Sequence, residues 1–228
     1  MKNRIYYLQA VLLIAMLIHF NILAQEDGDS GNKANQYMNR INIESLVNAF
    51  DSPERAEWQR PEKVIALFGD VSNQKIMDLG AGSGYFSLRL AAKGARVIAA
   101  DVDERFQEII RKKLENKDLS VLAERVELRK IGYDNPGLER EEVDGILIVD
   151  TWHHIDNRNM YIKKALEGVK KGGKIIIVDY KKGVPGGPPE NHKLGMEEAM
   201  KEFGDINVEN IHTDTKMLER QYIIMISK

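Results

Sequence analysis

The chain has 228 residues, of which 43% are hydrophobic and 30% charged, and its formal net charge is -2. This length and composition suit one compact α/β domain with a short extension, and they leave no room for a second sizeable domain. Lysines and arginines are interspersed with acidic residues, so we expect no nucleic-acid partner. The chain contains no cysteine, which excludes disulfides, thiolate metal sites and a cysteine nucleophile.

The N-terminal residues have the layout of a secretory signal peptide. Two basic residues precede an apolar run over residues 11–18, and Ala24 stands before a polar, acidic stretch. We predict that residues 1–24 form a signal peptide or a membrane anchor and that the folded part is exported to the periplasm or the cell envelope. If the segment is not cleaved, residues 5–24 tether the domain to a membrane, and a cytoplasmic, membrane-anchored protein is the alternative.

The rest of the chain divides into a linker and one domain. Residues 25–37 are polar and rich in glycine, aspartate and asparagine, which predicts a flexible linker. The domain extends over residues 38–228. It begins with a helical lid over residues 38–72, in which residues 39–51 and 52–69 carry helical apolar spacing.

Beyond the lid, short apolar runs alternate with helical segments at the spacing of repeated βα units. The first five strands are predicted over residues 75–79, 96–100, 125–131, 145–149 and 174–179. Helices are predicted over residues 85–93, 104–116, 157–170 and 195–203. The last two strands, over residues 207–212 and 221–227, are too close for a crossover and are expected to be antiparallel. The fold class is therefore α/β, with a mostly parallel seven-stranded sheet, a C-terminal antiparallel strand and helices on both faces.

Glycines alternate directly after the first predicted strand, in the run Asp78-Leu79-Gly80-Ala81-Gly82-Ser83-Gly84. Glycine tolerates positive φ and lets the backbone approach a ligand closely. The helix that opens at Tyr85 directs free N–H groups toward the same place. Asp101 ends the second strand, and an acid about 20 residues beyond such a loop typically accepts ribose hydroxyls. A nucleoside ligand is indicated, although a glycine turn without a ligand is the simpler alternative.

This glycine run resembles the first motif of Rossmann-like, class I S-adenosylmethionine-dependent methyltransferases. The resemblance implies a Rossmann-like fold, S-adenosyl-L-methionine as cofactor, and methyl transfer to an acceptor that we expect to be a small molecule. In that family the acid at the position of Asp78 helps hold the methionyl part, and the acid at the position of Asp101 binds the ribose. The residues that the resemblance assigns to cofactor binding are Asp78, Gly80, Ala81, Gly82, Gly84, Tyr85, Asp101, Val102, Tyr133, Asp134 and Asp150.

The loop after the third predicted strand is the candidate adenine site. In the family an acidic or amide side chain of this loop commonly accepts a hydrogen bond from the exocyclic amine of adenine. Asp134 is the candidate here, with Tyr133 and Asn135 beside it. Because asparagine followed by proline also forms a turn that needs no ligand, that alternative stays open.

The loop after the fourth predicted strand, residues 150–156, carries two adjacent histidines. Methyl transfer requires alignment, exclusion of water and, where the acceptor loses a proton, a base. Histidine titrates in the useful range, so His153, His154 and Asp150 are the candidate catalytic residues, with Asp150 or Asp156 orienting one imidazole. The alternative is that the pair only packs against cofactor or core. We expect no metal site, because the chain has neither thiolates nor an H-x-x-x-H spacing.

The lid supplies a further candidate set for substrate contact, namely Arg55, Trp58 and Gln59. Trp58 has an ordinary alternative role as a core aromatic residue. With the His153-His154 pair and Gln221-Tyr222 at the last strand, this stretch resembles a group of exported bacterial methyltransferase-like proteins that carry a histidine pair after the fourth strand. That resemblance implies a fold and a cofactor but no acceptor.

Two other functions stay open at this point. A non-catalytic protein of methyltransferase fold that binds S-adenosylmethionine or another nucleoside in the cell envelope would explain export, because S-adenosylmethionine is made in the cytoplasm. A nicotinamide-dependent dehydrogenase would need the spacing G-x-G-x-x-G, which this loop does not have.

Overall fold

The structure is a computed structural model, and it describes residues 35, 38, 40–204, 206–208 and 210–228. The predicted signal peptide and nearly all of the predicted linker lie outside these residues. Within the described part of the chain, no helix combines the length and apolar character needed to cross a membrane.

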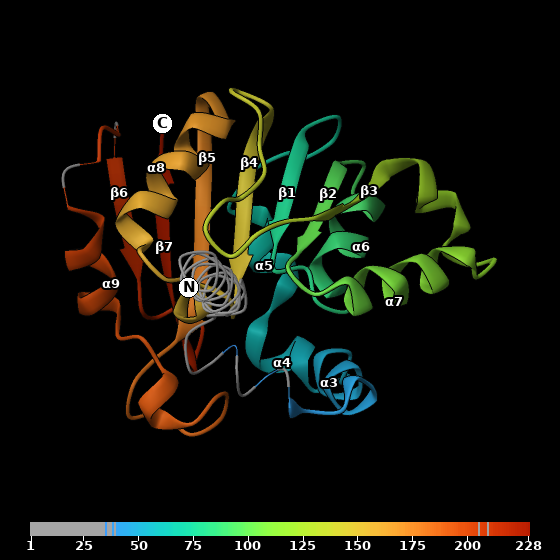
Figure 1. Cartoon of the computed structure of the whole chain (residues 1–228), viewed down its shortest axis with the longest axis horizontal. Coiled ribbons are helices and arrows are strands. Elements are labelled where there is room, and N and C mark those ends of the chain that lie inside the picture. Colours follow the sequence, from blue (N-terminus) through green and yellow to red (C-terminus); the bar gives the residue numbers. More distant parts are fainter. Residues whose placement is uncertain (1–34, 36–37, 39, 205, 209) are drawn as a thin grey trace, which may run out of the picture. The chain divides into compact units, whose positions relative to one another are not determined.

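Seven strands form one mixed sheet in the order β3-β2-β1-β4-β5-β7-β6 (Figure 1). Strands β1 to β5 are mutually parallel, and β7 is antiparallel to both of its neighbours, β5 and β6. The strands are β1 (Lys75–Leu79), β2 (Arg96–Asp101), β3 (Val126–Lys130), β4 (Val143–Val149), β5 (Val169–Tyr180), β6 (Asn210–Asp214) and β7 (Gln221–Ser227). The predicted sheet, with its C-terminal antiparallel strand, is confirmed.

Helices cover both faces of the sheet because the central strands are apolar on both sides. In β5, Ile175 and Ile177 pack in one core with residues of α8 and α9, whereas Ile176 and Val178 pack in a second core with residues of α5 and α6. The α-helices are α3 (Ile43–Phe50), α4 (Arg55–Gln59), α5 (Pro61–Ala66), α6 (Tyr85–Ala92), α7 (Glu104–Glu115), α8 (Arg158–Gly168) and α9 (Met196–Phe203). Short 3₁₀ turns are η1 (Ser120–Arg125), η2 (Trp152–His154) and η3 (Glu190–His192).

Several predicted boundaries differ from the structure. The helix predicted over residues 157–170 ends at Gly168, because Val169 already pairs with Val143 in the sheet. The lid segment predicted over residues 52–69 divides into α4 and α5 at Arg60, whose φ is 48°. Proline at position 61 lacks an N–H and starts the new helix at its first position. The strand predicted over residues 207–212 lies at Asn210–Asp214.

The helices α3 and α4 lie beyond the carboxyl edge of the sheet (Figure 1). Asp51, at the end of α3, joins them to the glycine loop: its carboxylate accepts hydrogen bonds from Ser83 Oγ at 2.7 Å and from Lys113 Nζ at 2.5 Å. Lys113 also donates to the Ser83 carbonyl at 2.7 Å. The lid is thus held over the edge at which parallel α/β sheets bind ligands.

Candidate active site

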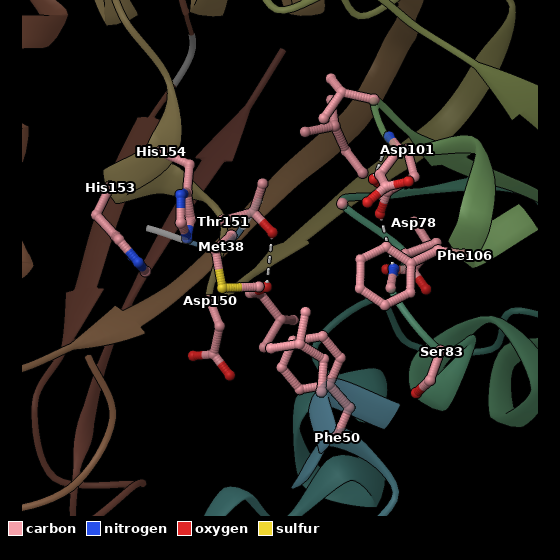
Figure 2. Close-up of a pocket in the computed structure, with 18 of the residues that line it drawn as sticks. Met38, Phe50, Asp78, Ser83, Asp101, Phe106, Asp150, Thr151, His153 and His154 are labelled. Atoms are coloured by element: carbon pink, nitrogen blue, oxygen red, sulfur yellow. Dashed lines mark hydrogen bonds between the residues drawn. The ribbon is translucent and has the colours of Figure 1, made fainter. Parts of the chain in front are cut away.

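A cavity of about 460 Å³ lies at the carboxyl edge of the sheet, and residues at or just beyond the ends of all five parallel strands line it. Helices α3 and α4 contribute the lid side of its wall. Asp78 and Asp101 stand at one end of the cavity and His153 and His154 at the other, with Asp150 between them (Figure 2). Candidate cofactor-binding residues and candidate catalytic residues therefore line the same cavity.

The glycine loop has the backbone that alternate glycines permit. All three glycines have positive φ, 78° at Gly80, 51° at Gly82 and 83° at Gly84. A Cβ at Gly80 would stand only 2.1 Å from Thr151 Oγ1, so the loop passes too close to the end of β4 for any larger residue. The amides of Gly80 and Ala81 donate to the Ala100 carbonyl at 2.8 and 3.0 Å, which ties the loop to β2.

Asp101 holds the glycine loop from the end of β2. Its carboxylate accepts hydrogen bonds from the Gly82 amide and the Asp103 amide, each at 2.9 Å. Each carboxylate oxygen has a second lone pair, so this cavity-lining group still has acceptor capacity for ligand hydroxyls. Burial raises the pKa of Asp101 to about 6, because the ionised form loses hydration.

Asp78 and Tyr85 form a polar part of the same end. Ser87 Oγ donates to Asp78 at 2.6 Å, and burial raises the pKa of Asp78 to about 6. Tyr85 is buried and lines the cavity, yet its hydroxyl has no hydrogen-bond partner among the described residues. The Arg55 guanidinium lies 4.3 Å from the centre of the Tyr85 ring. This end thus offers an anion, a cation and an unpaired hydroxyl to a polar ligand.

Asp150 connects the sheet to the lid. It follows β4 with φ of 55°, and its carboxylate accepts hydrogen bonds from the buried side-chain amides of Gln59, at 3.0 Å, and Gln221. Arg55 lies 3.5 Å away, and the two glutamines bond to each other at 3.2 Å. Burial raises the pKa of Asp150 to about 6. The prediction that Asp150 orients a histidine is therefore not supported; it organises α4 and β7 around the cavity.

This network makes Gln221 a structural residue with a measurable effect. We expect Gln221→Leu to lower the free energy of unfolding by about 2 kcal/mol, because the substitution keeps the volume but leaves the Asp150 carboxylate short of a donor. Gln74, whose amide donates to the Asp70 carbonyl nearer the surface, supplies the control. Gln74→Leu should cost less than about 1 kcal/mol in the same denaturant titration. Equal losses in the two variants would contradict the role given to the network.

His153 is paired with a carboxylate that the sequence analysis missed. Its Nδ1 lies 2.8 and 3.0 Å from the two oxygens of Asp179, and its backbone amide donates to the same carboxylate at 2.9 Å. Burial disfavours the imidazolium, but the Asp179 carboxylate outweighs burial and raises the pKa of His153. Asp179 is the last residue of the strand predicted over residues 174–179 and lies near the end of β5. Its place at this edge of the sheet could therefore be expected, but no sequence pattern pairs it with His153. Asp156, the other predicted partner, is exposed.

His154 differs from its neighbour. Its ring centre lies 4.2 Å from that of His153, and its Nδ1 has no hydrogen-bond partner within the described part of the chain. Burial, together with the charge of His153, lowers the pKa of His154 to about 3. The sequence does not distinguish the two histidines, but the structure does. His153 is paired with a carboxylate, and His154 is a neutral imidazole.

The structure brings most of the predicted site residues to the cavity. Those that line it are Arg55, Trp58, Asp78, Gly80, Ala81, Gly82, Tyr85, Asp101, Val102, Tyr133, Asp150, His153 and His154. Gly84 does not line it and instead begins α6, packed against Ile110. Gln59 is buried behind the wall. Asp134 is exposed and outside the lining, so its contact with adenine stays a prediction, whereas Tyr133 beside it does line the cavity.

The lid also contributes apolar residues that no sequence pattern singled out. Phe50 of α3 and Phe106 of α7 both line the cavity, with ring centres 5.8 Å apart. They stand on the side of Asp101 and Asp78 (Figure 2). A flat, apolar group of a ligand packs against such rings better than a charged one.

The raised pKa values of Asp78 and Asp101 predict opposite effects of pH on binding and on stability. Because both pKa values in the folded protein exceed the ordinary value, these groups contribute most to stability below about pH 4, and that contribution is lost as pH rises through 6. A ligand that needs the ionised carboxylates should instead bind at least about tenfold more weakly at pH 5 than at pH 7.5. Calorimetric titrations with S-adenosylhomocysteine at the two pH values measure this; affinity that is independent of pH would contradict it.

The fold is that of Rossmann-like methyltransferases. The family model described as "Methyltransferase domain" matches residues 77–177. Demethylmenaquinone methyltransferase of Clavibacter sepedonicus is 30% identical over 110 residues, which cover 48% of this chain and 42% of the relative. Ubiquinone biosynthesis O-methyltransferase of Dechloromonas aromatica is 24% identical over 126 residues, covering 55% of this chain and 50% of the relative. The chain thus spans about half the length of these relatives or less.

Solved structures show the same fold over most of the chain. An S-adenosylmethionine-dependent methyltransferase from Aquifex aeolicus has a TM-score of 0.69 and 22% identity, covering 82% of this chain and 98% of that one. Phosphoethanolamine N-methyltransferase 2 of Haemonchus contortus, in complex with S-adenosyl-L-methionine, has a TM-score of 0.63 and 13% identity, covering 82% of this chain and 60% of that one. These likenesses show a methyltransferase-type fold, and the family model matches its central part.

Proposed function

We propose that the protein transfers a methyl group from S-adenosyl-L-methionine to a small-molecule acceptor. The observation that carries this proposal is one cavity with two chemically different ends, a nucleoside-type end at Asp101 and the glycine loop, and a carboxylate-paired imidazole at His153. When bound, the cofactor supplies an activated methyl group on a positively charged sulfur.

The residues at the first end fit this cofactor. Asp101 has acceptor capacity for the ribose hydroxyls, and the glycine loop allows backbone approach. The Asp78 carboxylate, the Arg55 guanidinium and the Tyr85 hydroxyl match the ammonium and carboxylate of its methionyl part. Phe106 and Tyr133 supply an apolar wall for the adenine base of the cofactor.

Relatives named for the methylation of demethylmenaquinone and for ubiquinone biosynthesis support a small molecule, rather than a macromolecule, as the acceptor. The test is to incubate the full-length protein with S-adenosylmethionine labelled in its methyl group and an extract of the source cells. Label in the small-molecule fraction is expected. Label only in protein or nucleic acid would overturn the acceptor class. Tight cofactor binding with no transfer would favour the alternative, a non-catalytic binding protein of this fold.

We also propose that residues 1–24 direct export and that the protein belongs to the exported group with a histidine pair after the fourth strand. The basic start, the apolar run and the pairs His153-His154 and Gln221-Tyr222 support this proposal. Fractionation of cells that produce the full chain with a C-terminal tag provides the test. Recovery in the periplasm or the cell envelope, accessible to protease from outside the cytoplasm, is expected; a protected cytoplasmic domain would contradict it.

A further inference from the structure

His153 and Asp179 are joined by more hydrogen bonds than side-chain packing alone would require. Asp179 is fully buried, and its carboxylate receives three backbone or ring donors: the His153 ring at 2.8 Å, the His153 amide at 2.9 Å and the Tyr180 amide at 2.8 Å. These bonds fix the carboxylate and, through it, the plane of the imidazole. A buried carboxylate is costly unless it is bonded in this way, so the arrangement is specific.

The bond to Asp179 determines which nitrogen of His153 is basic. A carboxylate accepts but does not donate, so Nδ1 carries the proton and Nε2 carries the lone pair. The same carboxylate stabilises the imidazolium that forms when Nε2 takes up a proton, as in the serine protease triad. The His153 side chain belongs to the cavity wall, and its ring points toward the middle of the cavity (Figure 2).

His154 and Asp150, which line the cavity together with His153, are less suited as bases. His154 is held neutral by its environment, with a pKa lowered to about 3 by burial and by the charge of His153. The charge of Asp150 raises the pKa of His153, whereas that of Arg158 lowers it. His192 of η3 lowers the pKa of His154. Since Asp150 is bonded to two glutamines, His153 is the basic group best suited to take a proton at this end.

The wall on the side of β5 and the lid is aromatic. The rings of Trp58 and Tyr180 lie 6.1 Å apart between centres, and both line the cavity. Met38, Ile155 and Pro188 add apolar surface. Such a wall favours a planar, largely apolar molecule, and the carboxylate-paired imidazole of His153 in the same cavity favours one with an acidic hydrogen.

We propose that His153 is the general base for an acceptor that carries a hydroxyl group on a planar, largely apolar ring, with Asp179 as its positioning residue. The hydroxyl proton moves to Nε2 of His153. The oxygen electron pair forms the bond to the methyl carbon while the carbon–sulfur bond breaks, and that electron pair stays on the sulfur as a neutral thioether. His153 then returns the proton to solvent. This inference rests on the proposed function, since it assigns a role at the acceptor end of the same cavity.

The test follows ionisation of a chromogenic phenol and does not depend on turnover. Full-length protein is saturated with S-adenosylhomocysteine and titrated with 4-nitrophenol, whose absorbance distinguishes the phenol from the phenolate. We expect the bound probe to ionise about one pH unit or more below the free probe, since one unit corresponds to a modest electrostatic stabilisation. In His153→Gln the bound probe should stay neutral while affinity for S-adenosylhomocysteine changes less than about twofold. Asp179→Asn, which keeps the hydrogen bond but loses the charge, should remove most of the shift.

Asp156→Asn is the matched control, because this carboxylate lies three residues from His153 and is exposed. Its spectrum should equal that of the wild-type protein. A probe that does not bind to the wild-type protein, that binds to it as the neutral phenol, or that ionises in His153→Gln or Asp179→Asn as readily as in the wild-type protein would overturn the inference. Failure of the wild-type protein to bind S-adenosylhomocysteine would instead overturn the proposed function.

Discussion

Replacing Gly80 by alanine should lower the free energy of unfolding by about 3 kcal/mol and abolish measurable cofactor binding. A Cβ at this position would lie 2.1 Å from Thr151 Oγ1 and 2.6 Å from Thr151 Cγ2, so either the glycine loop or the loop after β4 must move. The positive φ of 78° adds a backbone cost of about 1 kcal/mol. Denaturant titration and calorimetry with S-adenosylhomocysteine measure the two effects.

Gly172 provides a matched control, because its φ is also 78° while a Cβ there would meet nothing within 4 Å. Gly172→Ala should therefore cost only the backbone part, about 1 kcal/mol, and leave cofactor affinity unchanged. The difference between the variants isolates the contact with Thr151. If both variants lose the same stability and both bind the cofactor normally, the site does not require the close approach of Gly80 to Thr151.

Replacing Asp101 by alanine should weaken binding of S-adenosylmethionine by about 100-fold or more. The carboxylate is the acceptor proposed for the ribose hydroxyls, and hydrogen bonds to a charged group contribute about 1.5–3 kcal/mol each. The substitution also removes the bond that positions the Gly82 amide. Calorimetric titration of the folded variant measures the loss.

Asp118→Ala is the control for this substitution, since Asp118 is an exposed carboxylate outside the cavity lining. Its affinity for the cofactor should match that of the wild-type protein. Asp101→Asn should be intermediate, because the amide keeps one acceptor oxygen but loses the charge. An Asp101→Ala variant that binds as tightly as Asp118→Ala would place the ribose elsewhere.

The parts of the site that the sequence predicts well are those encoded by contiguous residues. The run from Asp78 to Gly84 specifies a strand end, a turn and a helix start within seven residues, and positive φ at its glycines follows from residue type. Asp101 follows from the next strand by the same local rule. The mostly parallel sheet with its C-terminal antiparallel strand also follows, from the alternation of strands and helices and from the short gap before the last strand.

The partners of the histidine loop could not be predicted in this way. Asp179 lies 26 residues beyond His153, and it reaches the ring only because β4 and β5 are neighbours whose ends are in register. Asp150 similarly contacts Gln59 and Gln221, which are 91 and 71 residues away. Such contacts depend on strand register and on how the lid packs, and no spacing in the sequence records either. The sequence favours the nearer acids, Asp150 and Asp156, as orienting groups, whereas the structure pairs His153 with Asp179.

The most direct test of the account is a calorimetric titration of the full-length protein with S-adenosylmethionine, S-adenosylhomocysteine and, separately, NAD. The cavity predicts saturable binding of the first two with one site per chain and no binding of NAD, because the glycine spacing and Asp101 suit a single nucleoside. Binding of NAD alone, or of none of the three, would contradict the claim that this cavity is a methyltransferase cofactor site.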